Sequence, residues 1–257
     1  MKRFGLLFFL FLFMLGSYRS YSQASFDFGV DLMSRYIWRG LDLGGQSPSI
    51  QPFAEFDLTS KDSDHKFFLG AWGAYTFSPT SNQEVDLYLG YTFKEMITFT
   101  FTDYFFPGLN TGEMNDYFVY SADSTGHVME GMVSFDGTDK IPFTLLFAMN
   151  LYGNDTRKMN SDSTAGNIVM SKYLEVGYTH SFKNLDINPF VGIALDNAEK
   201  TMTGVGYYGN EKPAVINVGV KASKEIKITE KYSLPVQCSL VANPDASKLY
   251  LVFGISL

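Results

Sequence analysis

The sequence predicts an all-β protein: a transmembrane, up-and-down antiparallel β-barrel of about twelve strands, with about ten or fourteen also compatible. Three observations predict it. Apolar and polar residues alternate along most of the chain. Short connections and long connections follow one another between these alternating runs. The first residues form an export signal. Alternation places neighbouring side chains on opposite faces of an extended strand, which a helix does not do.

The N-terminal segment has the pattern of a secretory signal peptide. Two basic residues precede an apolar run at 4–15, and small residues after it predict cleavage just before Ser25. The apolar run is shorter than a membrane-spanning helix requires. We therefore expect a signal peptide at 1–24 and a single barrel domain at 25–257.

The charge and cysteine content exclude several classes of function. The formal net charge is −7, and the predicted signal peptide carries no acidic residue, so the mature chain is more acidic still. An acidic exported chain is a poor nucleic-acid binder. The single cysteine, Cys238, allows no internal disulfide and argues against a cysteine-ligated metal.

The stretch 26–40 shows the alternation most clearly. Apolar residues share one parity, and charged residues or glycine share the other; the apolar set is Phe26, Phe28, Val30, Leu32, Tyr36 and Trp38. In a membrane barrel the apolar face points to lipid and the polar face lines the lumen. A soluble sandwich would bury the apolar face instead, but so many lipid-compatible faces would then be a coincidence.

Similar runs follow to the end of the chain. The other predicted strands are 50–58, 67–77, 85–93, 97–102, 127–135, 141–152, 173–182, 185–195, 215–228, 232–241 and 248–257. A paired segment at 117–120 is a further possibility. An even strand count returns both chain ends to one side of the membrane.

The connections support the same topology. Short turns are expected at 60–64, 94–96, 137–140 and 183–184, and long connections at 107–126, 153–171 and 197–213. Outer-membrane barrels have short periplasmic turns and long outer loops.

The strand parity also predicts which side chains face the lumen. The candidates are Asp27, Asp31, Arg35, Arg39, Gln51, Glu55, Asp57, Asp86, Tyr88, Glu130, Glu175, Asp186 and Lys221. Their carboxylates outnumber their cations, so an open lumen would favour cations. A packed lumen is the alternative, with Arg35 and Arg39 paired to Asp27, Asp31 or neighbouring carboxylates. The sequence leaves both open, because a barrel of this size lies between filled and open kinds.

Aromatic residues at strand ends predict interface girdles. These are Tyr36, Trp38, Tyr104, Phe105, Phe106, Tyr152 and Tyr232. Tyr207 and Tyr208 lie in a long connection, where they either touch a ligand or partner or, as we expect, belong to a loop folded onto the barrel mouth.

No catalytic or metal site is predicted. Nucleophilic catalysis needs a serine and a histidine presented together, and none of His65, His127 and His180 has such spacing. Glu130 follows His127 by three residues, which places the two on opposite faces of a strand. The polar stretches 154–155 and 161–163 lack the spaced ligands of a calcium loop. We expect no enzyme and no cofactor.

Several short motifs stand out along the chain: SRYIWRG at 34–40, PSIQP at 48–52, EVDLY at 84–88, DYFFP at 103–107, TGHVME at 125–130 and YLEVGY at 173–178. They resemble blocks of the TorF-type outer-membrane porin family. The resemblance implies an outer-membrane barrel and a pore, but no substrate and no site residues. The last strand is similar to the signal read by the barrel-assembly machinery, with Phe253 in place and Leu257 where an aromatic residue is usual.

These observations predict a passive, porin-like channel for small polar solutes, with mild cation preference. The expected location is the outer membrane of a Gram-negative bacterium, and the expected partners are outer-membrane lipid, the assembly machinery and the solutes, without nucleic acid. The alternative is a closed barrel whose outer loops serve surface recognition or adhesion. An outer-membrane hydrolase is a third hypothesis.

Overall fold

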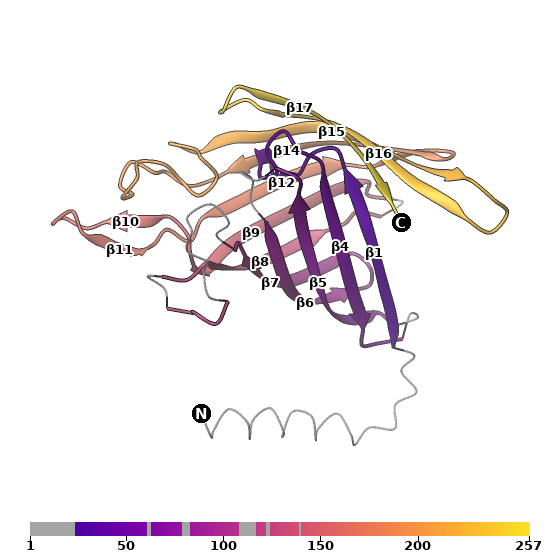
Figure 1. Cartoon of the computed structure of the whole chain (residues 1–257), viewed down its shortest axis with the longest axis horizontal. Coiled ribbons are helices and arrows are strands. Elements are labelled where there is room, and N and C mark those ends of the chain that lie inside the picture. Colours follow the sequence, from indigo (N-terminus) through magenta and orange to yellow (C-terminus); the bar gives the residue numbers. More distant parts are fainter. Residues whose placement is uncertain (1–23, 61–62, 79–82, 108–116, 122–123, 139) are drawn as a thin grey trace, which may run out of the picture.

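The computed structural model describes residues 24–60, 63–78, 83–107, 117–121, 124–138 and 140–257. Its strands form a closed antiparallel sheet (Figure 1). The segments of this sheet are β1 (Ser25–Met33), β4 (Ser49–Asp57), β5 (His65–Thr76), β6 (Glu84–Phe93), β7 (Ile97–Phe105), β8 (His127–Phe135), β9 (Phe143–Gly153), β12 (Lys172–Tyr178), β13 (His180–Phe182), β14 (Leu185–Ala194), β15 (Ala214–Lys227), β16 (Ser233–Asn243) and β17 (Lys248–Ser256).

The wall has twelve strands, which confirms the predicted fold. The sheet has 13 segments, but β12 and β13 are successive parts of one strand, because both pair with β14. Each other strand pairs with the strands before and after it in the wall, and β1 pairs with β17 to close the circle. Within the described residues, no helix is long and apolar enough to cross a membrane.

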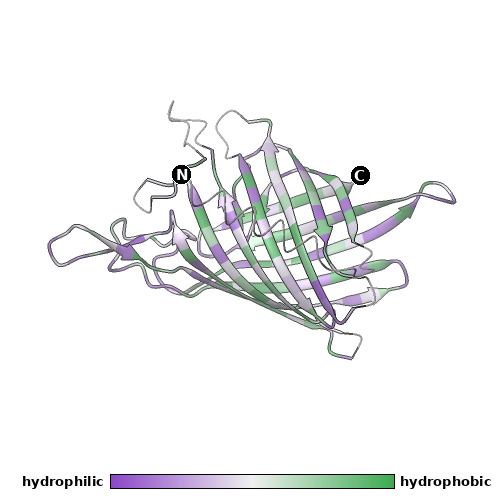
Figure 2. Ribbon diagram, turned by 90° about the horizontal axis from the view of Figure 1, so that it is seen from below, coloured by the Kyte–Doolittle hydropathy of each residue, from purple (hydrophilic) through white to green (hydrophobic). Residues whose placement is uncertain are grey.

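The alternation has the predicted consequence for the outer surface. Apolar side chains of one parity are exposed around the barrel, among them Phe28 at 71%, Leu89 at 59% and Phe253 at 52% exposed. Figure 2 shows the apolar positions recurring along every part of the wall. Exposed apolar surface on this scale would aggregate in water and suits a hydrocarbon surrounding.

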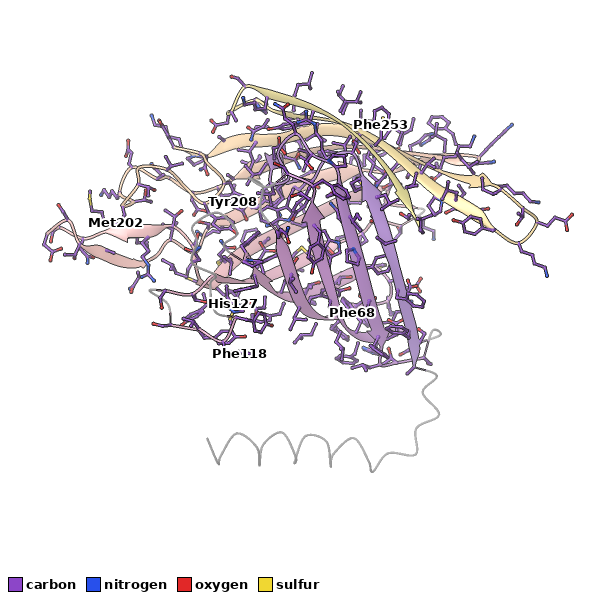
Figure 3. All side chains as sticks on the ribbon, in the orientation of Figure 1. Phe68, Phe118, His127, Met202, Tyr208 and Phe253 are labelled. Carbon is purple, nitrogen blue, oxygen red and sulfur yellow. The ribbon has the colours of Figure 1, made fainter. Side chains whose placement is uncertain are left out.

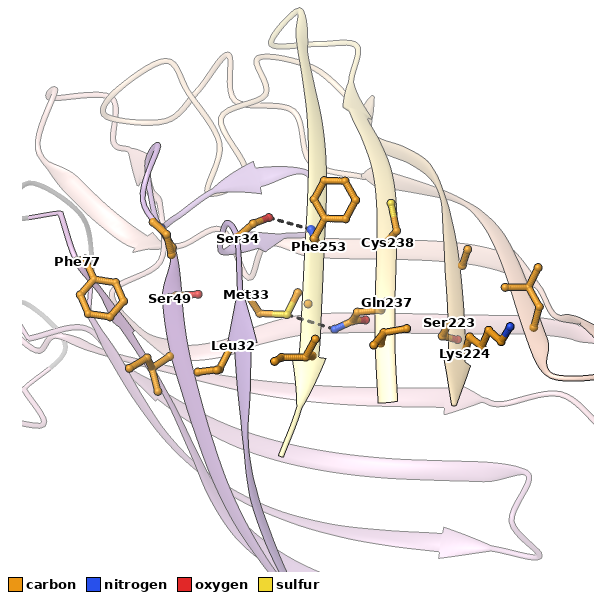
Figure 4. Close-up of a pocket in the computed structure, with 17 residues that line it drawn as sticks. Leu32, Met33, Ser34, Ser49, Phe77, Ser223, Lys224, Gln237, Cys238 and Phe253 are labelled. Carbon is orange, nitrogen blue, oxygen red and sulfur yellow. Dashed lines mark hydrogen bonds between the residues drawn. The ribbon is translucent and has the colours of Figure 1, made fainter. Parts of the chain in front are cut away.

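The barrel closes over a short seam. β1 and β17 share three residue pairs, Asp31–Met33 with Gly254–Ser256, whereas β1 and β4 share nine. Two side-chain contacts near the seam add to this pairing (Figure 4): Gln237 Nε2 donates to Met33 Sδ at 3.3 Å, and the Phe253 amide donates to Ser34 Oγ at 2.8 Å. An apolar groove of about 860 Å³ lies along these strands. The junction of β1 with β17 therefore has fewer paired residues than the junction of β1 with β4.

Turn chemistry explains the short connections. Lys94 and Glu95 both have positive φ, 52° and 55°, between β6 and β7. Two successive left-handed residues make the tight turn whose twist matches paired strands. The connections 153–171 and 197–213 lie at the opposite end, where the hairpin of β10 (Arg157–Met159) and β11 (Ala165–Ile168) extends past the wall (Figure 1).

Two predictions about strands were wrong. The first strand was expected to span 26–40, but β1 ends at Met33 and the chain leaves the wall there. It forms instead a small hairpin of β2 (Ile37–Trp38) and β3 (Leu41–Asp42), turning at Arg39 and Gly40 with φ of 49° and 79°. The segment 117–120 forms a turn and coil and pairs with no strand. The predicted signal peptide at 1–24 lies outside the described residues except for Ala24.

Candidate functional site

The β2–β3 hairpin folds into the lumen. It fills the half of the lumen that lies toward the long connections, called the outer half below. Trp38 and Leu41 pack against inward side chains of the wall, including Ala148 of β9, Tyr173 of β12 and Ile216 of β15, each 0% exposed. Gly40 sits so close to the wall that an added Cβ would lie 1.9 Å from the Ile216 carbonyl oxygen. Only glycine allows this approach, so the hairpin tip is held against β15.

An ion pair fastens the hairpin to the opposite wall. Arg39 Nη1 and Nη2 donate to Glu130 Oε2 and Oε1 at 2.5 and 2.9 Å, and these side chains are 8% and 1% exposed. The guanidinium also lies 4.4 Å from the Trp38 ring centroid and 4.8 Å from that of Tyr173. Two parallel bonds and stacked rings are the geometry that arginine provides and lysine does not.

A second connection completes the closure. Tyr208, from the long connection at 197–213, reaches into the barrel (Figure 3), where its ring stacks on Trp38 with centroids 5.9 Å apart. Arg39 Nη1 donates to the Tyr208 hydroxyl oxygen at 2.9 Å. Tyr207 meets the edge of Trp38 at 6.4 Å. The loop folded onto the barrel mouth, which we expected, is confirmed.

A polar cavity of about 520 Å³ remains below the hairpin. Trp72 of β5 and Glu84 and Asp86 of β6 line one side of it. Another side is lined by Tyr36 and Trp38, which belong to the segment 34–44 that carries the β2–β3 hairpin and is called the plug below. The Tyr36 hydroxyl donates to Glu84 Oε2 at 2.6 Å. Glu84 and Asp86 are only 1% and 5% exposed, so two carboxyl groups lie buried side by side at this cavity.

Glu84 was missed in the sequence because the predicted strand began one residue later, at Val85. Its parity matches that of the predicted Asp86, so extending the alternation by one residue would have found it. Glu84 has a polar uncharged neighbour at its N-terminal side, Gln83, and this hides the start of the strand.

Most other predicted lumen residues have polar partners. Hydrogen bonds join Asp31 to Ser256, Asp57 to Ser25, Glu55 to Tyr88, Gln51 to Ser49, and Glu175 to Asn217. Asp27 is paired across the sheet with Glu55, while Asp186 and Lys221 lie on β14 and β15 as exposed residues, paired with Ser223 and Asn188.

The two arginines pair with carboxylates other than Asp27 and Asp31, as one option of the packed lumen allowed. Arg35 lies 3.4 Å from Asp42 within the plug segment, and Arg39 pairs with Glu130, so neither uses Asp27 or Asp31. The alternation along β1 predicts the direction of the Asp27 and Asp31 side chains. It does not predict that of the two arginines, because the chain leaves the wall after Met33. The outer half of the lumen is therefore packed, and the carboxylates that pair with the arginines are Asp42 and Glu130.

The girdle prediction was wrong for four of its aromatic residues. Tyr36 is 5% exposed and, with Trp38 and Tyr104, lines the lumen cavity, while Phe105 is 6% exposed under Tyr117. Tyr152 and Tyr232 are exposed as expected, at 37% and 46%, and Phe106 is half-buried. Parity alone does not show that a segment has folded inward or that a loop covers an outward ring.

A histidine–aspartate pair lies on the outer face of the wall. His127 is fully buried; its Nδ1 lies 2.7 Å from Asp103 Oδ1, and its Nε2 lies 2.6 Å from the Tyr117 carbonyl oxygen. The Tyr120 ring stacks on it at 4.4 Å. The β7–β8 register brings Asp103 and His127 together, which local spacing does not reveal. In a hydrolase triad the second nitrogen would face a hydroxyl nucleophile, but here it faces a backbone carbonyl.

This pair should hold the segment 117–121 onto the barrel. We expect His127→Ala to speed chymotrypsin cleavage at 117–121 about tenfold, because Asp103 and the Tyr117 carbonyl lose a buried partner worth about 1–3 kcal/mol. Mass spectrometry of timed digests of the refolded barrel measures the rate. His180→Ala, at an exposed histidine, is the control, and equal rates in both variants would contradict the anchoring role.

No group of three or more His, Cys, Asp or Glu side chains in the described ranges could hold a metal ion.

Comparisons with solved structures return several chains of low sequence identity. They include a chain from a study of in-meso crystallization of membrane proteins (9% identity, 91% of this chain and 83% of that chain, TM-score 0.46). An outer membrane channel from Pseudomonas putida F1 matches at 10% identity over 94% and 97% of the two chains, with a TM-score of 0.44. The beta domain of the Bordetella autotransporter BrkA matches at 10% identity over 90% and 97%, with a TM-score of 0.34.

A search of curated proteins finds no match. The TorF-type name is not among these findings and stays a resemblance. A family model does match residues 19–238, which is most of the chain. The protein therefore belongs to the family described as "Bacterial protein of unknown function (Gcw_chp)".

Proposed function

We propose that this protein is an outer-membrane channel that passes small polar solutes passively and is closed at its outer half by the β2–β3 hairpin and Tyr208. The observation that carries the proposal is the polarity of the interior: the apolar side chains of the wall face outward, and buried carboxylates and an arginine face inward. A barrel that served only as an anchor would have no need of buried charge, which is costly away from water.

The mechanism would be passive. The plug is a short segment held by the Arg39–Glu130 ion pair, by hydrogen bonds of Tyr36, Arg39 and Gly40, and by ring contacts. Its displacement would join the cavity below it to the outside. The cation preference rests on the interior charge: Arg39 and Arg35 are matched by Glu130 and Asp42, which leaves the other inward carboxylates to act on passing ions. The predicted location, export by the segment 1–24 and insertion by the barrel-assembly machinery belong to the same proposal.

Planar-bilayer recordings test the proposal. After refolding in detergent, a migration shift between boiled and unboiled samples establishes a folded barrel. We expect discrete conductance steps and, under a salt gradient, a reversal potential with the sign of cation preference. A folded barrel without conductance would overturn the channel, and an anion-selective current would contradict the assignment of the inward carboxylates. Heat-unfolded protein is the control.

The closed barrel with a recognition role is the second candidate, and one observation favours it. The β10–β11 hairpin extends beyond the wall (Figure 1) while the outer half of the lumen is filled. Replacing residues 157–168 by a short glycine-serine linker would abolish binding of an outer partner while leaving conductance unchanged if the loops, rather than the lumen, carry the function.

A further inference from the structure

The cavity below the plug contains a buried carboxylate oxygen that has no partner among the described residues. Asp86 Oδ1 is inaccessible to solvent and accepts no hydrogen bond, although Asp86 lines the cavity. Its neighbour Glu84 is engaged by the Tyr36 hydroxyl through Oε2. A buried carboxylate oxygen without a donor is costly, so this oxygen indicates a missing positive or hydrogen-bonding group.

The fixed cations nearby are already committed. Arg39 makes two bonds to Glu130, and Arg35, which lines the same cavity, lies 3.4 Å from Asp42. Glu84 and Asp86 hydrogen-bond each other, so a proton lies between the two carboxyl groups and the pair keeps one negative charge. Because both arginines are paired elsewhere, this charge creates a negative potential inside the barrel. A cation that enters the cavity would be attracted to Glu84 and Asp86.

The other walls favour an organic cation over a metal ion. Trp72 and Tyr36 lie with ring centroids 5.5 Å apart beside the acidic pair, and Tyr104 and Trp38 also line the cavity. Aromatic faces attract ammonium groups and stabilise their apolar parts. Calcium would require six or more oxygen ligands, and the described residues contain no group that could hold a metal. At about 520 Å³ the cavity has the size of a small-molecule site.

We propose that this cavity binds a small organic ammonium ion, with the ammonium group at Glu84 and Asp86 and its carbon atoms against Trp72. The inference rests on the proposed function in that it names the class of solute held on the path through the lumen. Neutral molecules of the same size and anions would not be held, because a neutral molecule leaves the negative charge of the acidic pair without a counterion and an anion is repelled by that charge.

The test uses the intrinsic fluorescence of the protein. The sequence has 2 tryptophans, and both Trp38 and Trp72 line this cavity. The refolded, unboiled barrel is titrated with ethylammonium chloride at constant ionic strength, with ethanol as the neutral analogue and sodium acetate as the anion. We expect a saturable fluorescence change with ethylammonium only. An equal response to sodium chloride alone or to ethanol would overturn the inference.

Variants then assign the site. Asp86→Asn and Glu84→Gln should each raise the dissociation constant about tenfold or more, because a charged partner in a desolvated site is lost. Glu95→Gln is the matched control, since it removes the same charge from an exposed turn where Glu95 pairs with Lys66. Unchanged affinity in a folded Asp86→Asn barrel would overturn the inference.

Conductance of the wild-type protein separates this inference from the channel. A conducting barrel that shows no saturable ethylammonium response would refute the site and leave the channel. A non-conducting barrel that still binds ethylammonium through Asp86 would retain the site and refute the channel.

Discussion

Replacing Arg39 by methionine is expected to lower the free energy of unfolding by about 3–5 kcal/mol. Glu130, whose side chain is 1% exposed, would keep only the Tyr104 hydroxyl, which donates to Oε1 at 3.0 Å, and would be left as a buried charge without a cation. Denaturant unfolding of the refolded protein, followed by tryptophan fluorescence, measures the loss. Trp38 reports directly, because the guanidinium lies over its ring.

The double variant Arg39→Met with Glu130→Leu is the control for this result. Removing both charges takes away the desolvation cost together with the attraction, so it should recover most of the stability lost in the single variant. If the two variants unfold at the same denaturant concentration, the ion pair does not hold the plug, and its other contacts, such as the rings around Trp38 and the Tyr36–Glu84 hydrogen bond, must do so.

Removing the plug should have the largest effect on permeability. We expect replacement of residues 36–44 by a short glycine-serine linker to raise single-channel conductance about threefold or more, because a barrel of this size without internal filling leaves room for a wider aqueous path. The hairpin side chains Trp38 and Leu41 occupy the outer half of the lumen in the intact protein. Planar-bilayer recordings on the two proteins measure the ratio.

A matched replacement of residues 160–164, at the tip of the β10–β11 hairpin, controls for loop shortening as such. Those residues lie between β10 and β11 and are exposed, so their replacement should leave conductance unchanged. Equal conductance in the plug variant and the wild type would mean that the hairpin does not obstruct the path, and that the narrowest point lies elsewhere.

In the proposed channel, the plug would link stability to permeability. Arg39 contacts Glu130 of β8, Tyr173 of β12 and Tyr208 of the 197–213 connection, so one side chain joins elements far apart in the sequence. A solute or condition that weakened the contacts of Arg39 would therefore loosen the outer half of the lumen and, in the proposed channel, open it. The Asp103–His127 pair on the outer face contacts none of these residues directly and should act on the loop at 117–121 alone.

The sequence by itself determined the wall. Alternation is a local property with a fixed period, so the parity of Phe26, Leu89 or Phe253 predicts an outward side chain without knowledge of the neighbouring strand. The strand count and the alternation of short and long connections follow from the same local signals, and the structure has the twelve predicted strands. The inward position of Asp86 was readable in the same way.

Only the tertiary structure decided what fills the barrel. The apolar parity of β1 is interrupted at Ser34 and resumes at Tyr36 and Trp38, so a single polar residue is too little to mark Met33 as the end of the strand. The turn at Arg39 and Gly40 is stable because Ile216 and Glu130 lie where the hairpin tip arrives. The Arg39–Glu130 pair joins residues 91 positions apart. Such contacts depend on how the closed sheet brings distant segments together, and a periodic pattern carries no information about that.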